Sequence, residues 1–188
     1  MRTEKVIYTI GHSNHDQATF LKMLQTFDIE VLEDIRAFTK SRKYPQFNDE
    51  HMKEWLEEAG IEYRQDHELG GRRRPSNTVG RSLNSGWQNE SFHNYADYTL
   101  TDAFKDGIHT LEKIAGEKRT AYMCAEHHPA RCHRLIVSNY LVAKGWKVLH
   151  IMQNNKGDII TQEHRLGQWG AMPIIEDDGE VVYPQNTD

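Results

Sequence analysis

The sequence predicts an α/β fold: a mainly parallel sheet with helices on both faces, in a Rossmann-like three-layer arrangement, followed by a small C-terminal hairpin. Short apolar runs alternate with longer stretches in which apolar residues recur at helical spacing. Asp, Asn and Gly stand at the borders of these stretches, where such residues start and stop helices. The length of 188 residues suits one domain with a sizeable core. We therefore expect residues 1–188 to form a single α/β domain.

The expected strands are short apolar runs, and they fall at residues 6–10, 29–35, 61–63, 120–124 and 147–152. Residues 157–161 start one more short strand. The segment 174–183 has Asp178 and Gly179 at its centre, a pair that favours a tight hairpin turn. Strands that alternate with helices are joined by right-handed crossovers, so their carboxyl ends are expected to meet at one edge of the sheet.

Four stretches have helical periodicity, and capping residues, Pro and Gly mark their ends. The expected starts are, in chain order, Asn14 or Asp16, Asn48 or Asp49, residue 92, and Pro129. Gly60 ends the second helix, the third continues to residue 115, and Gly145 ends the fourth. Proline suits the first turn of the fourth helix because that turn needs no backbone N–H donor there.

Residues 72–91 form an irregular, Arg-rich loop without clear periodicity. Four arginines lie between Gly70 and Asn89 with no acidic residue among them, in a chain that is acidic overall. Long irregular segments in compact domains are usually functional or disordered. The local reversal of charge favours an anionic ligand under a mobile active-site lid. The alternative is a solvated surface loop, in which Arg73 and Arg74 have no individual role.

The composition limits the function classes. The formal net charge of -5 and the pI of about 6.1 argue against broad coating of nucleic acid, although the 72–81 region leaves a local contact open. The N-terminal segment lacks the long apolar core of a secretory signal, and no apolar run approaches membrane-spanning length. Two cysteines and many histidines without such a signal predict a reduced, cytoplasmic protein rather than a disulfide scaffold.

Polar residues gather where the predicted strands end. The residues expected at this edge are His12, Ser13, Asp34, Arg36, Gly70, Gly71, Arg72, Cys124, Glu126 and His150. In open α/β sheets ligands bind outside the carboxyl ends of the strands, and the following helix N-terminus favours negative charge. The edge is therefore the expected functional site.

Cys124 is the strongest candidate for a catalytic nucleophile. A thiol at a strand end, near a helix N-terminus and beside histidines or arginines, has a lowered pKa, and the thiolate is the nucleophile. The spacing to Arg131 resembles the loops of cysteine phosphatases and rhodaneses. Those loops have five intervening residues and glycine, whereas here six intervene, with Glu126 among them and no glycine. The alternative is a small buried residue that ends a core strand.

Cys132 lies on the predicted fourth helix. It can resolve a disulfide with Cys124, or share a metal ion with Cys124 and His133, but the spacing is not a familiar zinc pattern. Core packing on the inner helix face is the alternative. We therefore expect no metal ion and no cofactor.

Asp34 and Glu126 form a second constellation. Two converging carboxylates at strand ends can divide the roles of general acid and base. A carboxylate near Cys124 would instead raise the pKa of the thiol, so the two mechanisms compete. The alternative for either carboxylate is a buried ion pair with Arg36 or Arg134 that holds the loops in place.

The remaining candidates hold a ligand. His12 can act as an acid, a base or a donor to an anion, although a lone histidine is more often structural. Guanidinium groups pair bidentately with phosphate or carboxylate, and glycines let the backbone approach a ligand. The predicted substrate-binding residues are Ser13, Arg36, Gly70, Gly71, Arg72, Cys132, His133 and Arg134.

Several of these pieces together resemble the family of bacterial and archaeal proteins called domain of unknown function 488. The matching pieces are Thr9-Ile10-Gly11-His12-Ser13, Asp34-Ile35-Arg36, Leu69-Gly70-Gly71, Tyr95-Ala96, Cys124-Ala125-Glu126 and Cys132-His133-Arg134. The family commonly has a proline and a serine soon after Asp-Ile-Arg, whereas here the proline is delayed to Pro45. The resemblance implies an α/β fold and little about the reaction.

The residues favour a hydrolase or transferase that acts on an anionic, nucleotide-like or phosphorylated small molecule, through the Cys124 thiolate or the Asp34 and Glu126 carboxylates. Two other functions stay open. One is a non-catalytic module that binds a nucleotide, or nucleic acid through Arg72 and Arg81. The other is a sulfur-transfer or thiol redox protein, which requires Cys124 and Cys132 to lie close together.

Overall fold

The protein has a six-stranded, mostly parallel sheet between two layers of helices. A computed structural model describes residues 4–185. The strands of the sheet are β1 (Val6–Gly11), β2 (Val31–Asp34), β3 (Glu62–Gln65), β4 (Thr120–Cys124), β5 (Lys147–Gln153) and β6 (Ile159–Glu163). They are ordered β3-β2-β4-β1-β5-β6, and β6 is antiparallel to its neighbour β5. The predicted α/β fold is confirmed.

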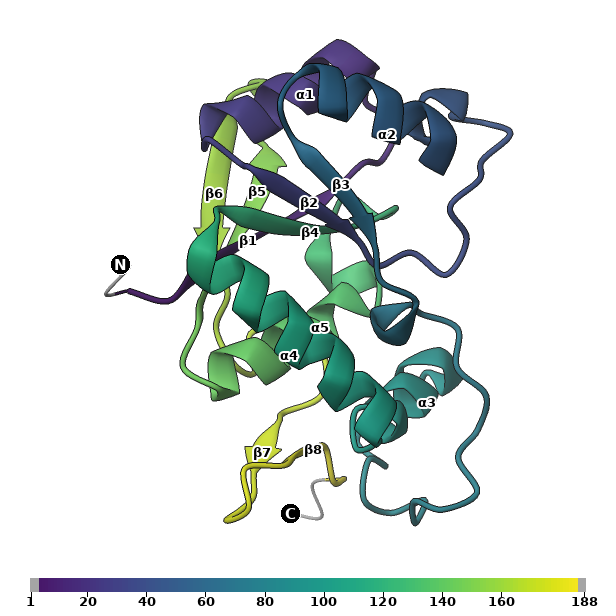
Figure 1. Ribbon diagram of the computed structural model, residues 1–188. Helices are drawn as coiled ribbons and strands as arrows, with labels where there is room; N and C mark the ends of the chain where they lie inside the picture. The colour runs from purple at the N-terminus through teal and green to yellow at the C-terminus, as the bar shows by residue number, and fades with distance from the viewer. Residues whose placement is uncertain (1–3, 186–188) are drawn as a thin grey trace.

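The helices cover both faces of the sheet, as Figure 1 shows. Their bounds are α1 (Gln17–Thr26), α2 (Asp49–Glu58), α3 (Glu90–Tyr98), α4 (Asp102–Glu117) and α5 (Arg134–Ala143). Phe20 of α1 and Trp55 of α2 share one apolar core with the sheet face around Ile10. Phe104 of α4 and Leu135 of α5 belong to a second core on the opposite face. Each sheet face is therefore sealed by its own set of helices.

The neighbouring strands β1 and β4 leave the sheet toward opposite faces. β1 leads into α1, whereas β4 leads into α5, and these helices belong to different cores. Such a divergence opens a crevice at the carboxyl ends of the two strands. Gly11 at the end of β1 lies in register with Cys124 at the end of β4. The crevice is therefore built directly above Cys124.

The C-terminal part forms a small separate sheet. Its two antiparallel strands are β7 (Ile174–Ile175) and β8 (Val181–Val182), joined by a turn in which Gly179 has a φ of 87°. This is the hairpin that the sequence predicts. Within residues 4–185, no helix combines the length and the apolar character that crossing a membrane requires.

Two predicted helices differ from those in the structure. The pattern from 92 to 115 belongs to two helices, because the chain breaks at Thr99–Thr101 and the Thr101 hydroxyl accepts a hydrogen bond from the N–H of Phe104. Pro129 starts a 3-10 turn, Pro129–Arg131, rather than the helix itself. α5 begins at Arg134. Cys132 therefore lies in the loop before the helix, not on it.

The loop after β4 passes tightly over the end of β1. The backbone N–H of His12 donates to the carbonyl of Cys124 (3.0 Å), and that of Ser13 donates to the carbonyl of Ala125 (2.9 Å). A Cβ atom added to Gly11 would lie 1.7 Å from the carbonyl oxygen of Glu126, which is backbone and cannot swing away. A glycine is therefore required at the end of β1 for this loop to close.

Alanine substitutions at Gly11 and at the uncrowded Gly116 should change the free energy of unfolding in opposite directions. Gly11→Ala should lower the free energy of unfolding by about 1–3 kcal/mol or more, because the new methyl overlaps backbone. Gly116→Ala, on α4, meets nothing within 4 Å and should raise it by up to about 1 kcal/mol through the helix propensity of alanine. Urea unfolding of both variants measures this. Equal midpoints would contradict the close approach.

Candidate functional site

A cavity of about 430 Å³ lies at the carboxyl edge of the sheet, with Cys124 and Cys132 in its wall. Its other lining residues are Arg36, Ala37, Phe38, Gly71, Arg72, Asn89, Ser91, Phe92, Tyr95, Ala125, Glu126, Arg131 and His133. A second hollow of about 500 Å³ lies beside it, and the two share Arg36, Phe38, Ala125 and Glu126. Both hollows thus meet at the loop that follows β4.

Arg134 lies behind the cavity and holds the loop together. Its side chain is fully buried and donates from Nε to the sulfur of Cys124 (3.1 Å). It also donates to the hydroxyl of Thr9 (2.7 Å) and to the carbonyls of Glu126 (2.8 Å) and His127 (3.1 Å). Among the described residues, none of these partners is a carboxylate. Cys124, as a thiolate, is therefore the group that can balance the buried guanidinium charge.

The two cysteines are in direct contact. Their sulfur atoms lie 2.6 Å apart, and both thiols are free. Burial by itself would raise the pKa of Cys124, but the Cys132 donor and the Arg134 guanidinium outweigh burial and lower that pKa to about 6. Burial and the neighbouring thiolate raise the pKa of Cys132. The pair therefore carries its negative charge on Cys124 and its proton on Cys132.

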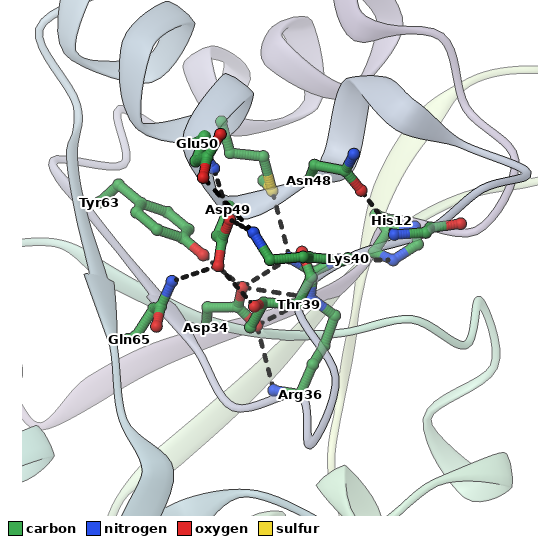
Figure 2. Close-up of polar contacts among 12 residues, drawn as sticks. His12, Asp34, Arg36, Thr39, Lys40, Asn48, Asp49, Glu50, Tyr63 and Gln65 are labelled. Atoms are coloured by element: carbon green, nitrogen blue, oxygen red, sulfur yellow. Dashed lines mark hydrogen bonds and ion pairs between the residues drawn. The ribbon is translucent and has the colours of Figure 1, made fainter.

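Asp34 and Arg36 form a buried ion pair, which Figure 2 shows with its surroundings. Arg36 donates to both carboxylate oxygens of Asp34 (2.7–3.1 Å), and the hydroxyl of Tyr63 donates to Oδ2 (2.6 Å). The backbone N–H of Arg36 donates to Oδ1 (3.0 Å). Both oxygens are thus occupied, and Asp34 does not line either hollow. This is the ion-pair alternative, not a free catalytic carboxylate.

His12 is also held on both ring nitrogens. Burial is the largest cause that lowers the pKa of His12, to about 4, so the ring is neutral at neutral pH. Its Nδ1–H donates to the carbonyl of Ser13 (2.9 Å), and its Nε2 accepts from Arg36 (3.3 Å). The ring stacks on Phe47 with centroids 4.5 Å apart. His12 therefore supports the Asp34–Arg36 pair and leaves no nitrogen free for proton transfer.

Glu126 and His133 have different positions around the cysteines. Glu126 is exposed, and it lines both hollows. The His133 ring donates from Nε2 to the carbonyl of Ile35 (2.7 Å), and burial is the main cause that lowers its pKa to about 4. A Cβ atom on Gly71 would come within 2.8 Å of this ring. Gly71 is thus needed for close packing on His133.

The arginines of the 72–91 loop do not act together. Arg72 lines the cavity with its guanidinium 4.5 Å from the centroid of the Phe38 ring. Arg73 turns back to the carbonyls of Gly70 and His67 and covers the Tyr98 ring. Arg81 pairs with Glu90 at the surface (3.5 Å). Arg72 is therefore the member of this group that reaches the cavity, and Arg131 joins it from the loop after β4.

The predicted site residues fall into three groups. Those in the wall of the first cavity are Arg36, Gly71, Arg72, Cys124, Glu126, Cys132 and His133. Those on the second hollow are His12 and Ser13, again with Arg36 and Glu126. Those beneath or beside the hollows are Asp34, Gly70 and Arg134, and His150 is also buried in the middle of β5 rather than at the edge.

Sequence reasoning missed Thr9 and Phe38. Thr9 is a buried polar residue inside an apolar strand, and this was its signal. Phe38 is 64% exposed, a feature that sequence alone does not show. The arginine that contacts the Cys124 sulfur is Arg134, one of the predicted substrate-binding residues, whereas Arg131 lines the cavity. Within residues 4–185, no group of three or more His, Cys, Asp or Glu side chains is arranged to hold a metal ion.

One comparison with known proteins gives a match. The family model described as "Domain of unknown function DUF488" matches residues 16–141, which include α1 to the greater part of α5. No curated protein and no solved structure matches the chain.

The shared proton of the cysteine pair gives a prediction with a matched control. Cys124 should react with iodoacetamide as a thiolate, with a rate that rises through pH about 6 and then levels off. Cys132→Ser keeps an O–H donor and should keep this profile. Cys132→Ala removes the donor and should raise the pKa by about 1–2 units. Alkylation rates resolved for each cysteine by mass spectrometry measure it, and identical profiles for Ser and Ala would contradict the proton sharing.

Proposed function

The chain belongs to the family described as domain of unknown function DUF488, and we propose that it is a thiol–disulfide exchange enzyme for a small anionic substrate. In this proposal Cys124 is the nucleophile and Cys132 is the resolving thiol. The proposal rests on one observation: the Cys124 sulfur lies between the Arg134 guanidinium (3.1 Å) and the Cys132 sulfur (2.6 Å), in the wall of an open cavity.

The chemistry follows from the charge on each sulfur. The Cys124 thiolate attacks one sulfur of a substrate disulfide R–S–S–R, a Cys124–S–S–R bond forms, and R–S⁻ leaves and takes a proton from solvent. Cys132 then loses its proton to solvent and attacks the Cys124 sulfur, so that a Cys124–Cys132 disulfide forms and the second R–S⁻ leaves. The cysteines lose two electrons, and the substrate disulfide gains them. Two molecules of a second thiol, R′–SH, then reduce the Cys124–Cys132 disulfide and leave together as the disulfide R′–S–S–R′.

The sulfurs need little movement for the second step. The two sulfurs lie 2.6 Å apart and must close to the length of a disulfide bond, about 2.05 Å. Cys124 is 2% exposed, whereas Cys132 is partly exposed. A substrate sulfur therefore has to enter the cavity to reach Cys124, which favours a small substrate over a folded protein.

The cavity favours an anionic substrate with an apolar part. Arg72 and Arg131 supply positive charge at its wall, and Arg36 is neutralised by Asp34. Phe38 and Phe92 line the same wall. Carboxylates pair well with guanidinium groups, so a peptide-like thiol with carboxylate groups fits this combination.

The other two readings have less support. Hydrolysis by Asp34 and Glu126 needs two free carboxylates, but Asp34 has both oxygens occupied. A nucleic-acid contact through the 72–91 loop needs several free arginines, but Arg73 and Arg81 have partners within the chain. Free thiols as the working form also fit a reducing compartment, and we propose the cytoplasm on that ground.

Glutathione disulfide is a suitable probe of the exchange reaction. The reduced wild-type protein should form a Cys124–Cys132 disulfide, and Cys132→Ser should stop at a Cys124–glutathione adduct because the resolving thiol is missing. Cys124→Ser should give neither product at neutral pH. Intact-mass and peptide mass spectrometry detect these species. The absence of both the disulfide and the adduct would contradict the proposed exchange reaction.

Two arginines of the same loop test the substrate charge. Arg72→Gln should raise the KM for glutathione disulfide by about 3- to 10-fold with little change in kcat, because a positive charge is lost from the cavity wall. Arg74→Gln removes the same charge outside the cavity and should leave KM near the wild-type value. Steady-state kinetics at low ionic strength measure both. Equal effects would mean a general charge effect rather than a contact.

A further inference from the structure

A chain of buried hydrogen bonds runs from the cysteine pair to the C-terminal hairpin. Arg134 donates to the Thr9 hydroxyl, which lies 2.6 Å from Nδ1 of His150. His150 Nε2 lies 2.9 Å from Nδ1 of His164, and His164 Nε2 lies 2.6 Å from Oδ1 of Asn139. Asn139 then donates to the hydroxyl of Tyr183 (3.1 Å). Every one of these side chains is buried.

The Asn139 end fixes the direction of the whole chain, and the Arg134 end is compatible with it. Arg134 can only donate, and the Oδ1 of Asn139 can only accept. His164 therefore carries its proton on Nε2, and its Nδ1 accepts from the Nε2–H of His150. The free Nδ1 of His150 then accepts from the hydroxyl of Thr9, whose oxygen accepts from Arg134. Each donor points away from Arg134, with no conflict at any link.

The direction requires both histidines to be neutral. A proton on Nδ1 of His164 would face the Nε2–H of His150, and two donors cannot bond each other. Burial is the largest cause that lowers the pKa of His150, to about 2, and of His164, to about 4. The charged group that faces both rings is Arg134, which disfavours a second positive charge, and the titratable groups that face His150 are His164 and His128. Trp169 packs against both rings.

We propose that Thr9, His150, His164 and Asn139 are positioning residues, which form a one-way hydrogen-bonded chain that holds the Arg134 guanidinium on the Cys124 sulfur. Because the Thr9 hydroxyl donates a hydrogen bond to His150, its oxygen becomes a better hydrogen-bond acceptor for Arg134. Thr9 and His150 face each other in register on β1 and β5, so the sheet itself sets the first link. The inference rests on the proposed thiolate chemistry.

Most residues of this hydrogen-bonded chain lie outside the segment that the family model matches. Thr9 precedes residue 16, and His150, His164 and Tyr183 follow residue 141. Tyr183 is in turn tied to the segment before α3, because its N–H donates to Asn84 (2.9 Å) and its carbonyl accepts from Gly86 (2.7 Å). The segments on either side of the matched region therefore supply residues of the proposed hydrogen-bonded chain.

The first test measures the pKa of Cys124 from the ultraviolet absorbance of the thiolate, in variants of the full chain. Thr9→Val keeps the shape but removes the hydroxyl, and it should raise the pKa by about one unit or more. Thr9→Ser keeps the hydroxyl and should restore the wild-type value. His164→Phe should give a smaller rise, and Tyr183→Phe the smallest, because they lie farther along the chain.

The matched control is Tyr63→Phe. It also removes a buried hydroxyl, but one that donates to Asp34 instead of to a member of the chain from Arg134 to Tyr183. A purely structural role would move the unfolding midpoint of all these variants and leave the Cys124 pKa alone. That outcome overturns the positioning role while the exchange reaction stands. A wild-type Cys124 pKa near that of a free thiol would instead overturn the exchange reaction and, with it, the chain's effect on the sulfur.

A second measurement needs no substitution. In the ¹⁵N spectrum of the wild-type protein, His150 and His164 should both appear as neutral rings protonated on Nε2, and neither should titrate above pH about 5. A ring protonated on Nδ1, or one that titrates near 6.5, would overturn the direction of the chain. This result is independent of any variant that fails to fold.

Discussion

The site depends on a buried positive charge that has no carboxylate partner within residues 4–185. Arg134 is fully buried, and its described partners are a thiol sulfur, a hydroxyl and two backbone carbonyls. Such a charge is costly to bury unless a negative group lies nearby. The same requirement explains the lowered pKa of Cys124 and the passage of the Glu126 and His127 carbonyls over the guanidinium. One constraint thus sets both the shape of the loop and the reactivity of the thiol.

A second buried guanidinium in the same site shows the contrasting case. Arg36 follows β2 and is neutralised by Asp34, with Tyr63 and His12 completing the hydrogen bonds. This pair carries no net charge and holds the loop that leads to Phe38. The two arginines lie at neighbouring strand ends, but one is balanced by a fixed carboxylate and the other by a group that can react. Residue type alone therefore does not decide whether a buried arginine at a strand end is balanced by a carboxylate.

The sequence was sufficient for the layers, the strand ends and the place of Cys124, because these follow from periodicity and from parallel pairing. It was insufficient where two local signals compete. The apolar pattern from 92 to 115 continues across the break before Thr101, since both helices bury their apolar faces in one core. Pro129 signals a helix start, but the turn it begins is 3-10. The Asp34 ion pair and the contact of Thr9 with His150 depend on side chains from different strands, which periodicity does not relate.

The place of β1 in the sheet has a consequence for how the protein is made. β1 precedes the other described strands in the sequence, but it lies between β4 and β5, whose residues come more than a hundred positions later. Until then its apolar face and both of its edges have no partner in the sheet. Pairings of such long sequence separation fold slowly and leave nascent chains prone to aggregation. Among the strands of this sheet, β1 therefore waits longest for its partners during synthesis.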